Sequence, residues 1–211
     1  RAALVTGASS GIGRAAAVAL ASRGISVILV ARNAEKLEQT AQACRGAHPT
    51  AAETDGADRR PTPAVDPLPS AAADDRAGSQ TTGTNHVPIV QTVPVDLAVP
   101  AARGRVLEEL LLNDLAVDYV LANAGVSQRS TALDTSDEVA NRLWEVNYRS
   151  VVEMARALVP PMVARGDGWF AAVSSMSAYV GAPWRSTYGA TKAALSAYFA
   201  TLANELNDSP V

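Results

Sequence analysis

Short apolar runs alternate with segments of helical periodicity along most of this 211-residue chain, and this alternation restricts the fold more than any other feature. Runs rich in β-branched and other apolar residues predict strands at 2–6, 25–30, 89–95, 117–122 and 169–174. Apolar residues at helical spacing predict helices at about 12–23, 35–44, 101–112, 136–165 and 186–207. The order predicts an α/β fold of Rossmann type: a doubly wound parallel sheet in three α/β/α layers, with ligands at the carboxyl ends of the strands.

The first predicted helix begins directly after a glycine-rich turn and ends before Gly24. We expect its apolar face to pack against the sheet, because apolar residues recur there at helical spacing. These residues are Ile12, Ala15, Ala16, Ala19 and Leu20.

A proline-rich segment interrupts the alternation between about residues 45 and 86. Five of the chain's twelve prolines lie between Pro49 and Pro69, and the segment has neither helical nor strand periodicity. The length and the 48% hydrophobic content suit a single domain over residues 1–211, and loop-closure entropy grows slowly enough with length to permit such an insertion. We interpret 45–86 as a low-complexity surface insertion, either a solvated loop or a docking segment for a partner.

The composition argues against several classes of function. A net charge of −3, with no basic stripe along the sequence, argues against a nucleic-acid partner. The single cysteine, Cys44, cannot form an internal disulfide, and no cluster of His and Cys has metal-ligand spacing, so no metal site is predicted. We expect an intracellular, cytoplasmic protein. Because the chain begins at Arg1 without Met, removal of an upstream anchor would instead leave it associated with the endoplasmic reticulum membrane.

The turn after the first predicted strand reads T-G-A-S-S-G-I-G over residues 6–13. Such a turn directs backbone N–H groups and a helix N-terminus at the sheet edge, which suits a pyrophosphate. The same residues match the G-x-S-x-G nucleophile elbow of hydrolases, with Ser9 as the nucleophile. That mechanism needs a histidine, and the only two, His48 and His86, lie in or at the edge of the proline-rich insertion. The pattern therefore favours phosphate binding, with an ordinary strand-to-helix connection as the alternative and a Ser9 hydrolase as a further hypothesis.

A second set of residues carries acid–base chemistry. Tyr188 and Lys192 are four apart in S-T-Y-G-A-T-K, so a helix places them on one face, one turn apart. A cation beside a phenol lowers the phenol's pKa and makes it a general acid/base near neutral pH. Ser175 follows a predicted strand and is placed to hydrogen-bond a substrate oxygen. The alternative for the Tyr–Lys pair is an ordinary helix surface.

Together these motifs resemble those of the short-chain dehydrogenase/reductase family. The stretch at residues 6–13 resembles the family's cofactor motif, N-A-G at 123–125 its strand-four motif, and Y-G-A-T-K at 188–192 its Y-x-x-x-K. Asn147 in E-V-N-Y falls where the family's helix asparagine stands, and Ser175 lies thirteen residues before the tyrosine, as the family's serine does. The resemblance covers nearly all of the chain except the insertion.

The resemblance implies a role for each matched residue. Tyr188 would exchange a proton with the carbonyl or hydroxyl oxygen, and Lys192 would lower the tyrosine's pKa and hold the nicotinamide ribose. Ser175 would orient the substrate, and Asn147 would support a water-linked proton relay. The alternative for Asn147 is a helix-interior side chain that satisfies backbone groups. The cofactor-binding residues predicted in this way are Gly7, Ser9, Ser10, Gly11, Ile12, Gly13, Arg32, Asp96, Leu97, Asn123, Ala124, Gly125, Tyr188 and Lys192.

The end of the second predicted strand favours NADP(H) over NAD(H). An acidic residue there would bind the adenine ribose 2′-OH and repel a 2′-phosphate, whereas an arginine accommodates the phosphate. The sequence has Arg32 and no acid in V-A-R-N at 30–33, although a solvated loop cation is the alternative for Arg32. Asp96 and Leu97, after the third predicted strand, resemble the family's adenine-contacting pair. The alternative for Asp96 is a helix N-cap.

The resemblance also implies partners. The stretch G-V-S-Q-R-S-T-A-L-D-T-S at 125–136 resembles a branch of membrane-associated reductases that act on lipid-like, retinoid or steroid carbonyls. A small carbonyl or alcohol substrate of lipid-like character is therefore expected. The helices at 136–165 and 186–207 resemble those that the family uses to form homo-oligomers. Six of their residues fit either such an interface or an ordinary core: Ala155, Leu158, Val159, Ala193, Ala194 and Ala197.

Family members normally continue beyond the Y-x-x-x-K helix into further strands and a substrate-covering segment, whereas this sequence stops at Val211. We expect a truncated sheet that lacks the C-terminal strands, with an exposed edge strand and a half-open site. Two main hypotheses follow. The first is an NADP(H)-dependent carbonyl reductase, an oxidoreductase that interconverts secondary alcohols and carbonyls. The second is a catalytically impaired dinucleotide-binding scaffold or regulatory protein.

Overall fold

The computed structural model describes residues 1–48, 88–112, 116–209 and 211. Most of the predicted 45–86 insertion lies outside these residues, and its two interpretations stay predictions, as does the single domain over 1–211. The elements in chain order are β1 (Ala2–Thr6), α1 (Gly11–Ala21), β2 (Ser26–Ala31), α2 (Ala34–Ala47), β3 (Val90–Pro94), α3 (Pro100–Leu112), β4 (Val117–Ala122), α4 (Asp137–Trp144), the π-helix η2 (Glu145–Arg149), α5 (Ser150–Arg165), β5 (Trp169–Ala172), the 3₁₀-helix η3 (Met176–Ala178) and α6 (Ser186–Glu205).

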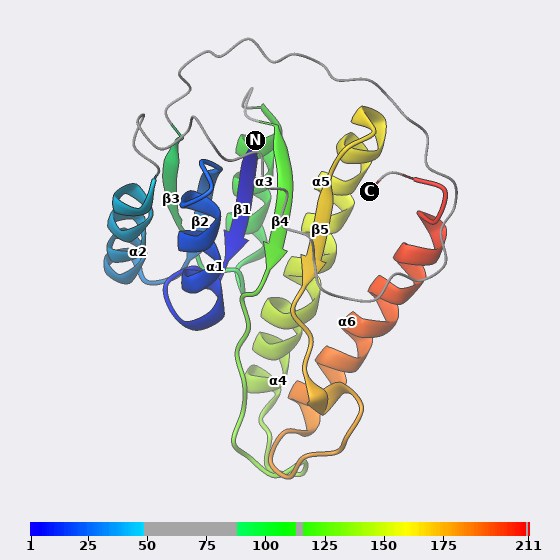
Figure 1. Ribbon diagram of the computed structural model, residues 1–211. Helices are drawn as coiled ribbons and strands as arrows, with labels where there is room; N and C mark the ends of the chain where they lie inside the picture. Colours follow the sequence, from blue (N-terminus) through cyan, green and yellow to red (C-terminus); the bar gives the residue numbers. More distant parts are fainter. Residues whose placement is uncertain (49–87, 113–115, 210) are drawn as a thin grey trace. The chain divides into compact units, whose positions relative to one another are not determined.

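The five strands of the described ranges form one parallel sheet in the order β3-β2-β1-β4-β5 (Figure 1). In register, Leu4 of β1 lies between Ile28 of β2 and Val120 of β4. The chain first builds outward from β1 through β2 to β3, and then returns to add β4 and β5 on the other side. The loops after β1 and β4 therefore diverge at a topological switch point, which is where such folds bind ligands.

Both faces of the sheet are buried, because alternate strand residues point to opposite sides and helices cover both. On one face, α1 and α2 pack against β1 and β2 through Ala17, Ala21, Leu37, Ala41 and Cys44 with Ala3, Val5, Val27 and Leu29. On the other face, α3, α5 and α6 pack against the sheet through Leu110, Val151, Met154, Leu158, Met162 and Leu195 with Leu4, Ile28, Val30, Val120 and Ala122. The predicted α/β Rossmann-type fold in three layers is confirmed.

The predicted apolar face of α1 is wrong except at Leu20, which packs against the core. The residues of α1 that are buried are Gly13, Ala17 and Ala21, whereas Ile12 is 65% exposed. The reason is a close backbone contact: Gly13 lies against the turn that precedes the helix, and this contact sets the rotation of α1 about its axis. Ile12 then points away from the sheet.

Two other element boundaries differ from the predictions. Helix α2 continues to Ala47, past the predicted end near Cys44 and into the segment interpreted as insertion. The helix predicted over 136–165 contains a π-helical turn, η2, between α4 and α5. No helix within the described part of the chain is long and apolar enough to cross a membrane.

Candidate active site

The turn between β1 and α1 is anchored to the end of β4 by Thr6. Its Oγ1 accepts hydrogen bonds from the N–H groups of Asn123 and Ala124, both at 3.0 Å. Gly7 and Gly11 have φ values of +66° and +53°, in the left-handed region that favours glycine. Ser10 precedes α1 without a side-chain cap hydrogen bond, so the first N–H groups of the helix are left for an external acceptor.

Gly13 leaves no room for a side chain. A Cβ there would lie 2.5 Å from the carbonyl oxygen of Gly7 and 2.7 Å from Nδ2 of Asn123. A Cβ on Gly7 would lie 2.8 Å from the same Nδ2. The two glycines therefore let the turn, the helix and the loop after β4 approach one another.

A cavity of about 360 Å³ opens at these strand ends. Its lining includes these predicted cofactor-binding residues: Gly7, Ser9, Ser10, Gly11, Ile12, Arg32, Asp96, Leu97, Asn123, Ala124 and Gly125. Three predicted residues are not in its lining, namely Gly13, which packs behind the turn, and Tyr188 and Lys192 of α6. The lining also includes residues that the sequence reasoning missed: Ala31, Val95, Val126, Arg142 and Val146.

The carboxylate of Asp96 is held by two partners beside the cavity. It accepts hydrogen bonds from the Ala98 N–H at 3.0 Å and from Nη2 of Arg142 at 3.0 Å, the latter an ion pair. Burial by itself would raise the pKa of Asp96, but these hydrogen bonds and the charges of Arg142 and Arg32 outweigh it and lower the pKa. Asp96 thus stays ionised next to the exposed, cavity-lining Arg32.

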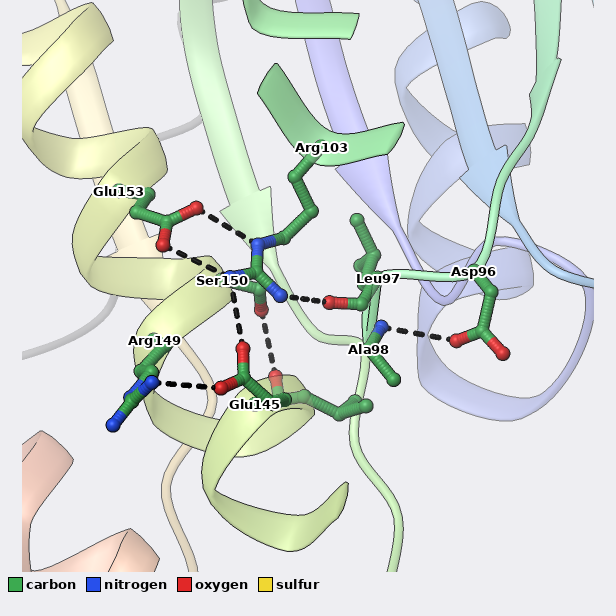
Figure 2. A network of polar contacts seen from close by, with 9 residues as sticks. Asp96, Leu97, Ala98, Arg103, Glu145, Arg149, Ser150 and Glu153 are labelled. Carbon is green, nitrogen blue, oxygen red and sulfur yellow. Dashed lines mark hydrogen bonds and ion pairs between the residues drawn. The ribbon is translucent and has the colours of Figure 1, made fainter. Parts of the chain in front are cut away.

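A buried arginine joins Leu97, which lines the cavity, to Glu145 and Glu153 (Figure 2). Arg103 of α3 is 2% exposed and donates to the Leu97 carbonyl oxygen at 2.6 Å. It also forms ion pairs with Glu145 at the start of η2 and with Glu153 of α5. Burial opposes the charge, but the carboxylates of Glu153 and Glu145 raise the pKa of Arg103 overall. The guanidinium therefore fixes Leu97, η2 and α5 relative to one another.

Asn147 lies in η2 and is fully buried. Its Oδ1 accepts from the Val126 N–H at 2.8 Å, and its Nδ2 donates to the Val126 carbonyl oxygen at 2.9 Å and to Oγ1 of Thr191 at 3.1 Å. Both amide hydrogens are therefore used within the protein. The side chain satisfies backbone groups of the loop after β4 and connects that loop to α6.

Lys192 and Tyr188 lie one turn apart on α6, as predicted, but in different surroundings. Lys192 is buried, and its Nζ donates to the Val173 carbonyl oxygen at 2.7 Å. Burial lowers the pKa of this ammonium. A Cβ on Gly125 would lie 3.8 Å from the same Nζ, so the lysine reaches the lining of the cavity. Tyr188 is half-buried, and its hydroxyl has no hydrogen-bond partner among the described residues.

Helix α6 is attached to the loop after β4 by Gln128. Its Oε1 accepts from the Tyr188 N–H at 3.0 Å, and its Nε2 donates to Ser186 Oγ at 3.2 Å. Gln128 thereby supplies an acceptor for the first turn of α6, which lacks a side-chain cap of its own. Ser175 lies at the start of η3, where its Oγ accepts from the Ser177 N–H at 3.1 Å. The Ser175 hydroxyl proton stays available to donate.

Two of these positioning residues, Arg103 and Arg142, lie outside the motifs singled out in the sequence, and Gln128 lies in the 125–136 stretch without a role assigned to it. Arg103, Gln128 and Arg142 contact partners 46 to 60 residues away, which periodicity cannot detect. Thr6 and Thr191 could have been predicted from the sequence, because they directly precede Gly7 and Lys192 inside the two motifs.

Comparison with known proteins agrees with this arrangement. The family model described as short chain dehydrogenase matches residues 1–66 and 70–211. The chain belongs to the short-chain dehydrogenase family. The chain is 33% identical over 208 residues to Dehydrogenase/reductase SDR family member 7B of Bos taurus, and the alignment covers 99% of the chain and 54% of that protein. It is 30% identical over 203 residues to an Anopheles gambiae protein named Dehydrogenase/reductase SDR family protein 7-like, covering 96% and 53%.

Among solved structures, the short-chain dehydrogenase from Sphingobium yanoikuyae in complex with NADPH aligns with a TM-score of 0.76 at 25% identity. The alignment covers 99% of this chain and 66% of that structure. The chain spans about half the length of the curated relatives that it matches.

Proposed function

We propose that this short-chain dehydrogenase is an NADP(H)-dependent oxidoreductase that interconverts a secondary alcohol and a ketone or aldehyde, with Tyr188 as general acid/base. One observation carries the proposal. The Nζ of Lys192, one helical turn from Tyr188, lies 3.8 Å from where a Cβ of the cavity-lining Gly125 would be. The Tyr188–Lys192 pair and the cavity beside the glycine-rich turn therefore meet at one sheet edge.

The residues at this edge fit a dinucleotide. The turn at Gly7 and Gly11 and the uncapped N-terminus of α1 would hold its pyrophosphate. Arg32 would pair with a 2′-phosphate, and Asp96 and Leu97 line the same cavity beside it. When bound in reduced form, the nicotinamide supplies the hydride.

The protein's own residues supply the proton and the orientation. Tyr188 would give a proton to a carbonyl oxygen or take one from an alcohol, and Lys192 would lie one helical turn away at the nicotinamide ribose. Ser175, with a free hydroxyl proton, donates to the same substrate oxygen. Asn147 holds Val126 and Thr191 in place behind this site, which supports a positioning role alongside the relay implied by the family resemblance.

The similar proteins support the same class of reaction. The Bos taurus relative is named a dehydrogenase/reductase, and the Sphingobium yanoikuyae structure is a complex with NADPH. We extend both properties to this chain, and the glycine-rich turn in the lining of the cavity supports the extension.

The decisive experiment compares the wild type with Tyr188→Phe. We expect the wild-type chain to oxidise NADPH in the presence of a ketone or aldehyde. The variant should bind NADPH with unchanged affinity and lose at least a hundredfold in kcat, within the range that a general acid/base contributes. NADPH binding without turnover in the wild type would instead favour the dinucleotide-binding scaffold.

The preference for NADP(H) is tested separately with Arg32→Ala. We expect tryptophan quenching to show tighter binding of NADPH than of NADH in the wild type. The substitution should weaken NADPH binding about tenfold, which corresponds to about 1.4 kcal/mol, and leave NADH binding unchanged. Equal weakening for both nucleotides would contradict a 2′-phosphate contact.

We further propose that two copies associate through the helices at 136–165 and 186–207. Ala155, Leu158 and Val159 are buried within the chain and belong to its core. Tyr148, Ala194, Ala197, Tyr198 and Leu202 instead line an open groove of about 350 Å³ on η2 and α6, and this groove is the interface we propose. Sedimentation of the wild type against Ala197→Arg tests it, because a bulky, charged side chain in the middle of the groove would leave only monomers.

A further inference from the structure

A second cavity, of about 430 Å³, lies next to α6 and is lined by Arg129, Trp184 and Arg185. None of these residues lines the dinucleotide cavity described above. Two of the three carry a permanent positive charge, and no carboxylate is part of the lining. The cavity is therefore cationic.

The position of Arg185 connects this cavity to the acid–base site. Its guanidinium carbon lies 5.9 Å from the ring centroid of Tyr188, above the ring, and its Nη1 donates to Ser127 Oγ. Ser127 belongs to the loop after β4, two residues beyond the cavity-lining Gly125. A molecule that contacts Arg185 therefore lies close to Tyr188, the residue that would exchange the proton.

Trp184 is held in an unusual backbone conformation. Its φ is +60°, and among the described residues it is the only non-glycine residue with positive φ. The side chain is 63% exposed and lines the cavity together with the two arginines. A conformation that is costly for a large residue, and an aromatic face left open to solvent, are both typical of a binding surface rather than of a core.

No carboxylate of the described residues pairs with either of the two arginines of this cavity. Two guanidinium groups on one cavity repel each other until an anion lies between them. Planar guanidinium groups bind carboxylates and phosphates through paired hydrogen bonds.

We propose that this cavity is an anion subsite for the substrate, so that the chain acts on carbonyl compounds that carry a carboxylate or phosphate group a few bonds from the reacting carbon. The inference rests on the proposed function, since Tyr188 marks the position of the carbonyl. Arg129 and Arg185 bind the anionic group, and Trp184 packs against the connecting carbon atoms.

The first test measures anion binding without turnover. A variant with Trp144→Phe and Trp169→Phe leaves Trp184 as the single tryptophan. We expect titration with inorganic phosphate to change its fluorescence saturably. Adding Arg129→Gln should abolish the change, whereas Arg105→Gln, which removes the same charge from the exposed face of α3, should not. No saturable change, or an equal loss in both variants, would overturn the subsite.

The second test measures selectivity with NADPH and a matched pair of ketones, levulinate and its uncharged methyl ester. We expect the wild type and Arg105→Gln to have the higher kcat/KM for levulinate, and Arg129→Gln to lower the levulinate-to-ester ratio about tenfold. Arg129→Lys should restore part of it. Reduction of both ketones with a ratio that Arg129→Gln does not alter would overturn the subsite and leave the proposed function intact. A phosphate response without reduction of either ketone would support the subsite and contradict the proposed function.

Discussion

Arg103 of α3 binds Glu153 of α5 through two parallel hydrogen bonds, from Nε to Oε2 at 2.8 Å and from Nη2 to Oε1 at 2.9 Å. The same guanidinium reaches Glu145 at 2.9 Å and the Leu97 carbonyl oxygen at 2.6 Å (Figure 2). One buried side chain thus contacts groups from three separate segments. Removal of one member of such a cluster lowers the stability of the fold strongly, because the remaining charges stay buried without a partner.

Arg103→Met should therefore destabilise the protein by about 3 kcal/mol. This value is at the lower end of the range for removing one partner of a buried ion pair, because Glu153 is partly exposed to water. Urea unfolding measures the loss. Arg149→Met is the matched control, since Arg149 also pairs with Glu145 but is 63% exposed, and it should cost no more than about 0.5 kcal/mol. Similar losses for both variants would show that burial of Arg103 is not the cause.

Gly13→Ala should disrupt the phosphate-binding turn. Its Cβ would lie 2.5 Å from the Gly7 carbonyl oxygen, so the turn must move. We expect a loss of about 2 kcal/mol in stability, as for overpacked sites, together with a loss of NADPH binding in tryptophan quenching. Gly104→Ala in α3, where a Cβ would meet nothing within 4 Å, should instead be neutral or stabilising by up to about 1 kcal/mol. Unchanged NADPH binding in Gly13→Ala would contradict the role of the turn.

Asn147→Leu should leave the N–H and C=O groups of Val126 without their partners. Each buried, unsatisfied group costs about 1 to 3 kcal/mol, so we expect a total loss of about 3 kcal/mol in urea unfolding. Thr191→Val removes only one acceptor of the same amide and should cost about 1 kcal/mol. Equal losses in the two variants would show that the contacts with Val126 contribute little to stability.

Lys192→Met should change how stability depends on pH. Burial lowers the folded-state pKa of Lys192 below its ordinary value of 10.5. Between the folded and unfolded pKa values the unfolded chain binds more protons, so this lysine makes the free energy of unfolding rise with pH. The wild type should therefore gain stability relative to Lys192→Met as the pH increases toward 10.5, in urea titrations at several pH values. A Lys36→Met control, at an exposed position of α2, should follow the wild type.

Local patterns predicted the strands well, because strands buried on both faces are continuous apolar runs. The predicted bounds 2–6 and 117–122 are those observed for β1 and β4. The face of α1 was wrong for a physical reason: the pattern assigned the large Ile12 to the core, whereas the contact between Gly13 and the preceding turn sets the helix rotation. The π-helical turn at η2 also has no signature at a period of 3.6 residues.

By itself, the sequence determined the order of strands and helices, the position of the glycine-rich turn after β1, and the spacing of Tyr188 and Lys192 on one helix. These are local properties, set by residues within a few positions of one another. Only the tertiary structure decided which groups meet: the Asn147 amide with Val126, the Lys192 ammonium with the Val173 carbonyl, and Arg129 with Arg185 at one cavity. Such pairs depend on how separate elements pack, and local periodicity contains no information on distances between them.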